Sequence, residues 1–309
     1  MPKKRPSRGK KHKPSADGFK LDLAIPKALL GKRAHRLSDD EIVGMLLDAL
    51  ANATLDEGSD LYADEAGDLD AAQALVYDAW DAPSRRRRIA LAKKALAMSP
   101  LCADAYVILA QEAQSVDETL AFYREGLTAG ERALGAAAFE EDVGDFWGLL
   151  ETRPYMRARR GLAMTLWQVG EKNEAVAHYQ DMLRLNPNDN QGIRYLLLDA
   201  LLELDHDKDA AKLMKRYKDD GSAAWTWSGA LLAFRRKGDD AASRKAIAAA
   251  VRTNPHVPAY LFGEKKLPSS LPEYIGWGDE TEAVSYARGA APAWAATPGA
   301  LAWARSALP

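Results

Sequence analysis

Apolar residues recur every three or four positions along most of this chain, which is the spacing of one buried face on an α-helix. The first such stripe follows Ser38 and Glu41, whose spacing is typical of a capping box at a helix start. The stripe consists of Ile42, Met45, Leu46, Ala49, Leu50 and Ala53. A second helix is predicted from about Asp70 to Trp80.

The composition agrees with a helical fold. Of the 309 residues, 47% are hydrophobic and 28% are charged, a balance that supports a packed core. Val and Ile, which favour strands, number only 17 together, whereas the strong helix formers Ala and Leu dominate. We therefore predict an all-α protein.

An internal repeat is the most informative feature of the sequence. Helical hairpins of the tetratricopeptide type repeat about every 34 residues, with small residues where the two helices touch, a turn between them and a closing proline. The segment from Met156 to Pro187 fits this pattern, with Gly170 at the turn. Two further units follow, and Asp205 replaces the turn glycine in the first of them. The predicted units are 156–189, 190–223 and 224–257.

Each hairpin leaves an apolar face that only its neighbours can cover. We therefore predict one α-α superhelix, a tetratricopeptide-like solenoid, over residues 37–309, with an irregular acidic insertion near residues 139–154. Residues 258–309 would cap the stack, because Trp294, Leu301 and Trp303 supply apolar cover for its open end. Asp279 and Glu282 have the spacing of a capping box for the last helix.

Charge divides the chain into two parts. Residues 1–36 carry a net charge of +10, whereas the remaining residues carry −12. A segment so basic and so poor in apolar residues is predicted to be a disordered tail. Two interpretations of this tail stay open. The tail has a function, either as an arm that neutralises nucleic-acid phosphates or as a nuclear-import signal in a eukaryote. Alternatively, it is a solvated extension without a partner.

The single cysteine, Cys102, excludes an internal disulfide and a cysteine-based zinc framework. Its small apolar neighbours favour a buried packing role. No apolar run approaches the ~20 residues that cross a bilayer, and no apolar stretch follows the basic start to complete a signal peptide. We expect a cytoplasmic protein, or a nuclear one if the source is eukaryotic, with no membrane contact.

The first helix of each predicted unit would line a concave groove. Aromatic and arginine side chains on such a surface are typical of binding hot spots, which favours a protein or peptide partner. The alternative is that Trp167 and Trp225 pack between helices. The groove residues predicted from the register are Arg157, Arg160, Met164, Trp167, Gln168, Tyr195, Asp199, Glu203, Trp225, Ser228 and Arg235.

The acidic insertion offers a different chemistry. Five carboxylates between residues 140 and 151 supply oxygen ligands of the kind that Mg²⁺ and Ca²⁺ prefer. A metal-dependent hydrolase is therefore an alternative function, although the spacing fixes no geometry. No phosphate-binding glycine loop, zinc-binding helix or serine elbow occurs, so we expect neither a cofactor nor catalysis.

Several segments resemble the suppressor of tumorigenicity seven family over about residues 139–303. They are Asn186-Pro-Asn-Asp-Asn-Gln, Tyr195-Leu-Leu-Leu-Asp-Ala-Leu-Leu-Glu-Leu, Asn254-Pro-His-Val-Pro-Ala-Tyr-Leu, Gly278-Asp-Glu-Thr-Glu-Ala, Ala293-Trp and Pro298-Gly-Ala-Leu. The resemblance implies a tetratricopeptide-like helical domain without an established catalytic activity, so it supplies no site residues. A membrane location is not transferred, because the membrane-spanning segments associated with animal members are absent from this sequence.

The sequence thus favours a non-enzymatic helical-repeat adaptor that holds a protein or peptide segment in its groove. A factor that grips nucleic acid or ribonucleoprotein through its basic tail is the main alternative.

Overall fold

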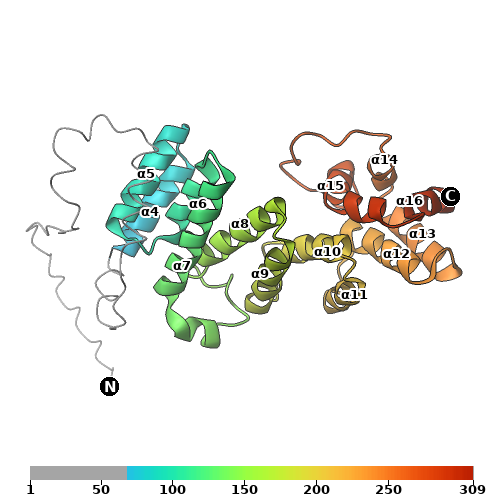
Figure 1. The fold of residues 1–309 in the computed structure, drawn as a ribbon, viewed down its shortest axis with the longest axis horizontal. Coiled ribbons are helices and arrows are strands. Elements are labelled where there is room, and N and C mark those ends of the chain that lie inside the picture. The colour runs from blue at the N-terminus through green and yellow to red at the C-terminus, as the bar shows by residue number, and fades with distance from the viewer. Residues whose placement is uncertain (1–67, 309) are drawn as a thin grey trace, which may run out of the picture. The chain divides into compact units, whose positions relative to one another are not determined.

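A computed structural model describes residues 68–308. The basic tail 1–36 and the helix predicted from the stripe between residues 38 and 53 lie outside the described residues. Within residues 68–308 the chain forms thirteen helices and no strand (Figure 1). The prediction of an all-α fold is confirmed for this part of the chain.

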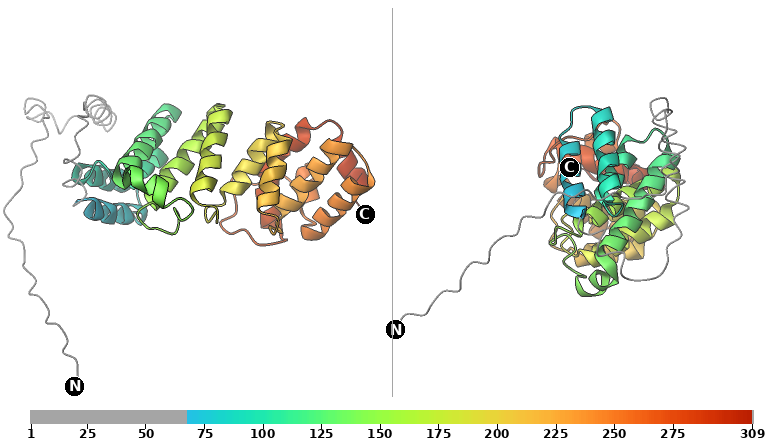
Figure 2. Two further views of the ribbon diagram at one scale, coloured as in Figure 1. Left: turned by 90° about the horizontal axis from the view of Figure 1, so that it is seen from below. Right: turned by 90° about the vertical axis from the view of Figure 1, so that its left-hand side faces the viewer.

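Ten of these helices form five consecutive hairpins. The hairpins are α4 (Leu69–Trp80) with α5 (Arg85–Met98), α6 (Ala103–Glu112) with α7 (Val116–Glu141), α8 (Arg153–Val169) with α9 (Lys172–Leu185), α10 (Ile193–Glu203) with α11 (Asp207–Arg216), and α12 (Ala223–Lys237) with α13 (Ala241–Thr253). Each hairpin also contacts the next one, through α5 and α6, α7 and α8, α9 and α10, and α11 and α12. Figure 2 shows the hairpins following one another in chain order. The predicted array of stacked helical hairpins is confirmed.

The turns inside two hairpins need a left-handed backbone. Gly170 ends α8 with φ 93°, and Asp205 lies between α10 and α11 with φ 57°. Glycine adopts this region without steric cost, and Asp is one of the few other residues that visit it routinely. This explains why an aspartate can stand where the repeat pattern otherwise has a glycine.

The predicted insertion is shorter than expected, because α7 continues to Glu141. The segment between α7 and α8 is held by aromatic packing: the ring of Phe139 lies 5.2 Å from that of Phe146 and 5.1 Å from that of Tyr155. The backbone N–H groups of Gly144 and Phe146 both donate to the carbonyl of Leu185 in α9. The insertion is thus anchored against the hairpin that follows it.

The C-terminal part comprises α14 (Val257–Leu261), α15 (Glu280–Ala296) and α16 (Ala300–Ala307). The cap of α15 is partly as predicted, since Asp279 accepts hydrogen bonds from the backbone of Thr281 and Glu282. Trp303 of α16 stacks on Phe234 of α12 with ring centres 4.5 Å apart. The feature that the repeat pattern did not indicate is the path of α15, which packs against both α10 and α12.

Candidate functional site

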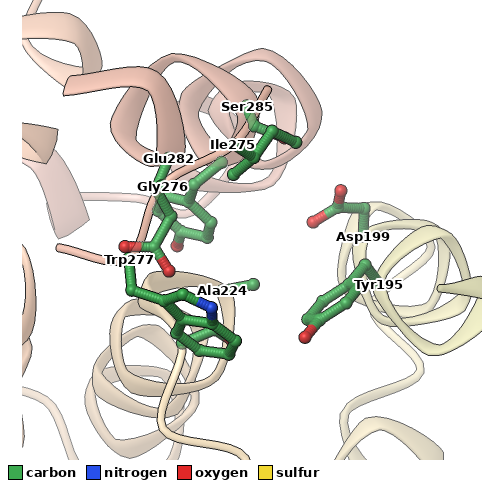
Figure 3. A pocket seen from close by; sticks show the side chains of 10 residues that line it. Tyr195, Asp199, Ala224, Ile275, Gly276, Trp277, Glu282 and Ser285 are labelled. Carbon is green, nitrogen blue, oxygen red and sulfur yellow. The ribbon is translucent and has the colours of Figure 1, made fainter. Parts of the chain in front are cut away.

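A pocket of about 290 Å³ lies where α15 and the segment before it meet α10 and the start of α12 (Figure 3). Aromatic, hydroxyl and carboxylate side chains share its wall. The lining residues are Tyr195, Asp199, Ser222, Ala224, Ile275, Gly276, Trp277, Glu282, Ser285 and Tyr286.

Two aromatic rings stand on opposite sides of this pocket. Figure 3 shows Tyr195 on α10 facing Trp277, which comes from the segment between α14 and α15. Trp277 is 72% exposed, and its neighbours Tyr274 and Ile275 are exposed as well. Large apolar residues exposed together beside a pocket are characteristic of interaction sites.

Tyr195 is held in place by a buried charge network. Its hydroxyl donates to Asp220 at 2.9 Å and accepts from Arg194 at 2.7 Å. The Arg194 guanidinium lies 4.4 Å from the centre of the Tyr195 ring and forms ion pairs with Asp189 and Asp220. One face of the ring is therefore occupied from within the protein, and the hydroxyl is already used.

The opposite wall is fixed by Glu282, which the sequence assigned to a capping box. Its carboxylate instead accepts from the backbone N–H groups of Ala223 and Gly278 and from the side-chain amide of Asn254, at 2.8 to 2.9 Å. Glu282 thereby ties α15 to α12, to the end of α13 and to the segment that carries Trp277. It gives the pocket a rigid rim.

Asp199 differs from these carboxylates because no hydrogen bond or ion pair to it is found among the described residues. Its side chain is mostly buried, and Figure 3 shows it directed into the pocket. Removal from water, followed by the nearby charge of Glu203, raises the pKa of Asp199 to about 8. An unpaired carboxylate in such a place destabilises the fold when it is ionised.

Tyr195 and Asp199 are the two predicted groove residues that the structure brings into this pocket. Three others lie in the interior. Trp225 is buried edge-on to Tyr195, and Ser228 is fully buried. The Arg235 side chain is 7% exposed and bonds to Asp207, to the Leu202 carbonyl and to α15.

This arrangement differs from the open groove expected along the three predicted units. The physical reason is that α15 covers the first helices of the second and third units, so side chains there meet the protein itself. Trp225, Ser228 and Arg235 therefore contribute to packing.

Five of the remaining predicted residues are on α8 and do not line the pocket, whereas Glu203 is the last residue of α10 and acts on the charge of Asp199. Arg157 pairs with the buried Asp104 of α6. The Lys172 ammonium lies 5.0 Å from the Trp167 ring and 2.5 Å from Glu203, which links α9 to α10. Arg160 and Met164 are half-buried, and Gln168 is exposed.

Sequence reasoning missed Arg194, Ile275, Trp277 and Gly289. Trp277 lies in a loop with no periodic pattern, and Gly289 stands inside a helix that carries many small residues. A usable signal did exist for Arg194, because an Arg with Tyr195 beside it and Asp189 upstream favours a charge network. Their roles depend on contacts across the array, which hydrophobic periodicity does not report.

The carboxylates of the acidic insertion do not gather into a cluster of three or more among the described residues. No group of three or more His, Cys, Asp or Glu side chains among residues 68–308 is arranged to hold a metal ion.

Cys102 is buried, and burial raises the pKa of its thiol to about 11. None of the helices in this range has both the length and the apolar character needed to cross a membrane.

Comparison with known proteins gives a family match. A family model described as ST7 protein matches residues 51–306. Suppressor of tumorigenicity 7 protein-like from Bos taurus is 31% identical over 236 residues, which cover 69% of this chain and 42% of the relative. Suppressor of tumorigenicity 7 protein from Macaca fascicularis is 29% identical over 275 residues, covering 74% and 51%. The chain thus spans about half the length of the curated relatives it matches.

Among solved structures, the crystal structure of YrrB is similar over 60% of this chain and 83% of its own. YrrB is described as a TPR protein with an unusual peptide-binding site. The sequences are 17% identical and the TM-score is 0.39.

Proposed function

This chain belongs to the ST7 protein family, and we propose that within that family it is a non-enzymatic scaffold that binds a segment of a partner protein. The proposed binding site is the pocket between α10 and α15, together with the exposed apolar residues at its mouth. Stacked helical hairpins supply the rigid support that such a site requires.

The observation that carries this proposal is the combination of a preformed pocket with unsatisfied groups around it. Asp199 has no partner within the described residues, and Tyr274, Ile275 and Trp277 expose apolar surface beside it. A guest segment would cover that surface and supply a partner to the carboxylate. Within the described residues, the fold neither covers these apolar side chains nor supplies a partner to Asp199.

The chemistry of the wall favours binding over catalysis. Ser222 and Ser285 line the pocket, but no His or Cys accompanies them there. The Ser222 hydroxyl already accepts a hydrogen bond from the backbone of Trp225. A serine nucleophile needs a base within hydrogen-bond reach, and neither serine is hydrogen-bonded to Asp199 or Glu282, the carboxylates of the lining.

Selection from a displayed library of random peptides tests the proposal with the full chain as bait. Peptides that bind should lose at least about tenfold in affinity when Trp277→Ala is introduced. Tyr77→Ala is the matched control, because Tyr77 is an exposed aromatic residue on α4. Peptides that bind both variants equally would place the site elsewhere.

A nucleic-acid-binding function rests on a different observation, the net charge of +10 in residues 1–36. Deleting these residues separates the two functions. A nucleic-acid role predicts that salt-sensitive binding of RNA or DNA disappears with the deletion, whereas the scaffold role predicts that peptide binding persists. We propose a cytoplasmic location, because a chain with one cysteine, Cys102, does not depend on internal disulfides.

A further inference from the structure

Resting on the proposed function, we propose that the pocket receives the side chain of a Lys or Arg residue from the partner segment. Asp199 would be the counter-ion, and the rings of Tyr195 and Trp277 would be the walls around the cation. The proposal concerns the chemical class of the guest residue, which the proposed function leaves open.

The first argument is the unpaired carboxylate. Asp199 is directed into the pocket and has no donor among the described residues. The helix opposite is shaped around it: a Cβ atom added at Gly289 of α15 would overlap the Asp199 carboxylate. The contact between α10 and α15 therefore leaves room for the Asp199 carboxylate, although this carboxylate has no partner among the described residues when it is ionised.

The second argument is the aromatic wall. The faces of aromatic rings attract cations, and the attraction strengthens when both groups are removed from water. Tyr195 already has one cation over its ring, the Arg194 guanidinium at 4.4 Å. Arg194 is neutralised by Asp189 and Asp220, so its charge does not oppose a second cation in the pocket.

The third argument is the sign of the surrounding charge. Glu203 on α10 and Glu282 on α15 are the acidic groups near Asp199, while Tyr195 and Tyr286 are the other titratable groups that face it. Lys172, the cation beside Glu203, is bound to that carboxylate. The charged residues that line the pocket, Asp199 and Glu282, are both acidic, and no Lys or Arg lines it, which disfavours an anionic guest and favours a cationic one.

A neutral apolar guest fits less well for a related reason. It would cover Asp199 without pairing it, and burying an unpaired carboxylate is costly. The carboxyl group would then have to stay protonated. A cation instead lowers the free energy of the ionised form, so binding of an ammonium or guanidinium group releases the proton that Asp199 holds below about pH 8.

The direct experiment uses three small probes and the full chain. The probes are the Nα-acetyl methylamides of lysine, arginine and norleucine, the last of which lacks the charge but keeps a similar chain. Binding is followed by the indole N–H signal of Trp277 in NMR spectra, assigned with the variant Trp277→Phe. The lysine or the arginine probe should bind at least about tenfold more tightly than the norleucine probe.

Two isosteric variants complete the test. Asp199→Asn should abolish the preference for the cationic probes, whereas Asp209→Asn, at an exposed carboxylate on α11, should leave it unchanged. Equal binding of lysine, arginine and norleucine probes, or an unchanged preference in Asp199→Asn, would overturn the proposal. Peptides whose affinity falls in the Trp277→Ala variant but not in the Asp199→Asn variant would also overturn this proposal. The proposed function would stand in that case.

Discussion

Gly289 of α15 leaves the space that the carboxylate of Asp199 on α10 occupies, and a methyl group at position 289 would overlap it. Glycine inside a helix is itself unfavourable by about 1 kcal/mol relative to alanine. The two residues thus form a pair in which one residue makes room for the other.

The pair predicts that Gly289→Ala is destabilising only while Asp199 is present. Gly289→Ala alone should lower the free energy of unfolding by about 1–3 kcal/mol, because a packed carboxylate must move. In an Asp199→Ala background the same change should raise it by about 1 kcal/mol, since only the better helix propensity of alanine remains. Urea unfolding of the four proteins in this double-mutant cycle measures the coupling. Additive effects would contradict the described contact.

Asp199→Asn should stabilise the free protein at alkaline pH. The pKa of Asp199 is raised from its ordinary value of 3.8 to about 8. The native state therefore holds a proton that the unfolded state has lost, and stability falls as pH rises through this interval, by at most about 1.4 kcal/mol per pH unit. Because part of the side chain faces water, we expect a gain of about 1–3 kcal/mol near pH 9 from Asp199→Asn.

Urea unfolding of the wild-type and Asp199→Asn proteins at several pH values measures this gain. It also distinguishes a role of Asp199 in binding from a role in packing. Below about pH 3, Asp199 is mostly protonated in both states, and the two proteins should unfold at similar urea concentrations. A variant that is more stable yet no longer prefers a cationic probe would show that Asp199 serves binding at the expense of the fold. A destabilised Asp199→Asn protein across the whole pH range would contradict this assignment.

Binding of the lysine probe should become tighter as pH rises. Only the ionised carboxylate attracts the ammonium, which itself stays charged below about pH 10. If the ionised form alone binds, a pKa of about 8 gives a rise of roughly 90-fold between about pH 6 and pH 9. Tyr195 stays neutral in this window because burial raises its pKa to about 12. A titration series at several pH values measures the slope, and a flat profile would contradict the role of Asp199.

Arg194→Ala should unfold the protein more readily and disorder the pocket wall. Its removal leaves Asp189 and Asp220 without their ion-pair partner, and those side chains are 1% and 4% exposed. Removing one partner of a buried pair costs about 3–5 kcal/mol. Arg244→Ala is the matched control, because it breaks only the exposed pair with Asp239 and should leave the melting temperature unchanged. Similar melting temperatures for the two variants would refute the structural role of Arg194.

The sequence was sufficient for the parts of the fold that depend on local pattern. The spacing of apolar residues predicted the helices, and the turn at Gly170 and the replacement by Asp205 were both visible in the repeat. Capping by Asp279 was visible for the same reason, since the donors lie within three residues of it. Each of these features is determined by neighbours in the chain.

The pocket could be predicted only in part. Tyr195 and Asp199 were found because they share one face of a predicted helix. The return of α15 across α10 and α12 has no local signal, because it depends on long-range packing of small residues such as Ala287 and Ala290. That return buries Ser228 and Arg235 and brings Trp277 opposite Tyr195, so it both closes the expected groove and creates the pocket.

Site-specific cross-linking tests the central claim most directly. A photoreactive benzoylphenylalanine replaces Tyr274, which is 80% exposed beside the pocket without lining it, and in a second protein it replaces Tyr77 on α4. A peptide selected on the full chain is added, the sample is irradiated, and the adducts are mapped by mass spectrometry. We predict adducts at position 274 that Trp277→Ala suppresses, and none at position 77. A bound peptide that cross-links at position 77, or that leaves position 274 unmodified, would contradict the account.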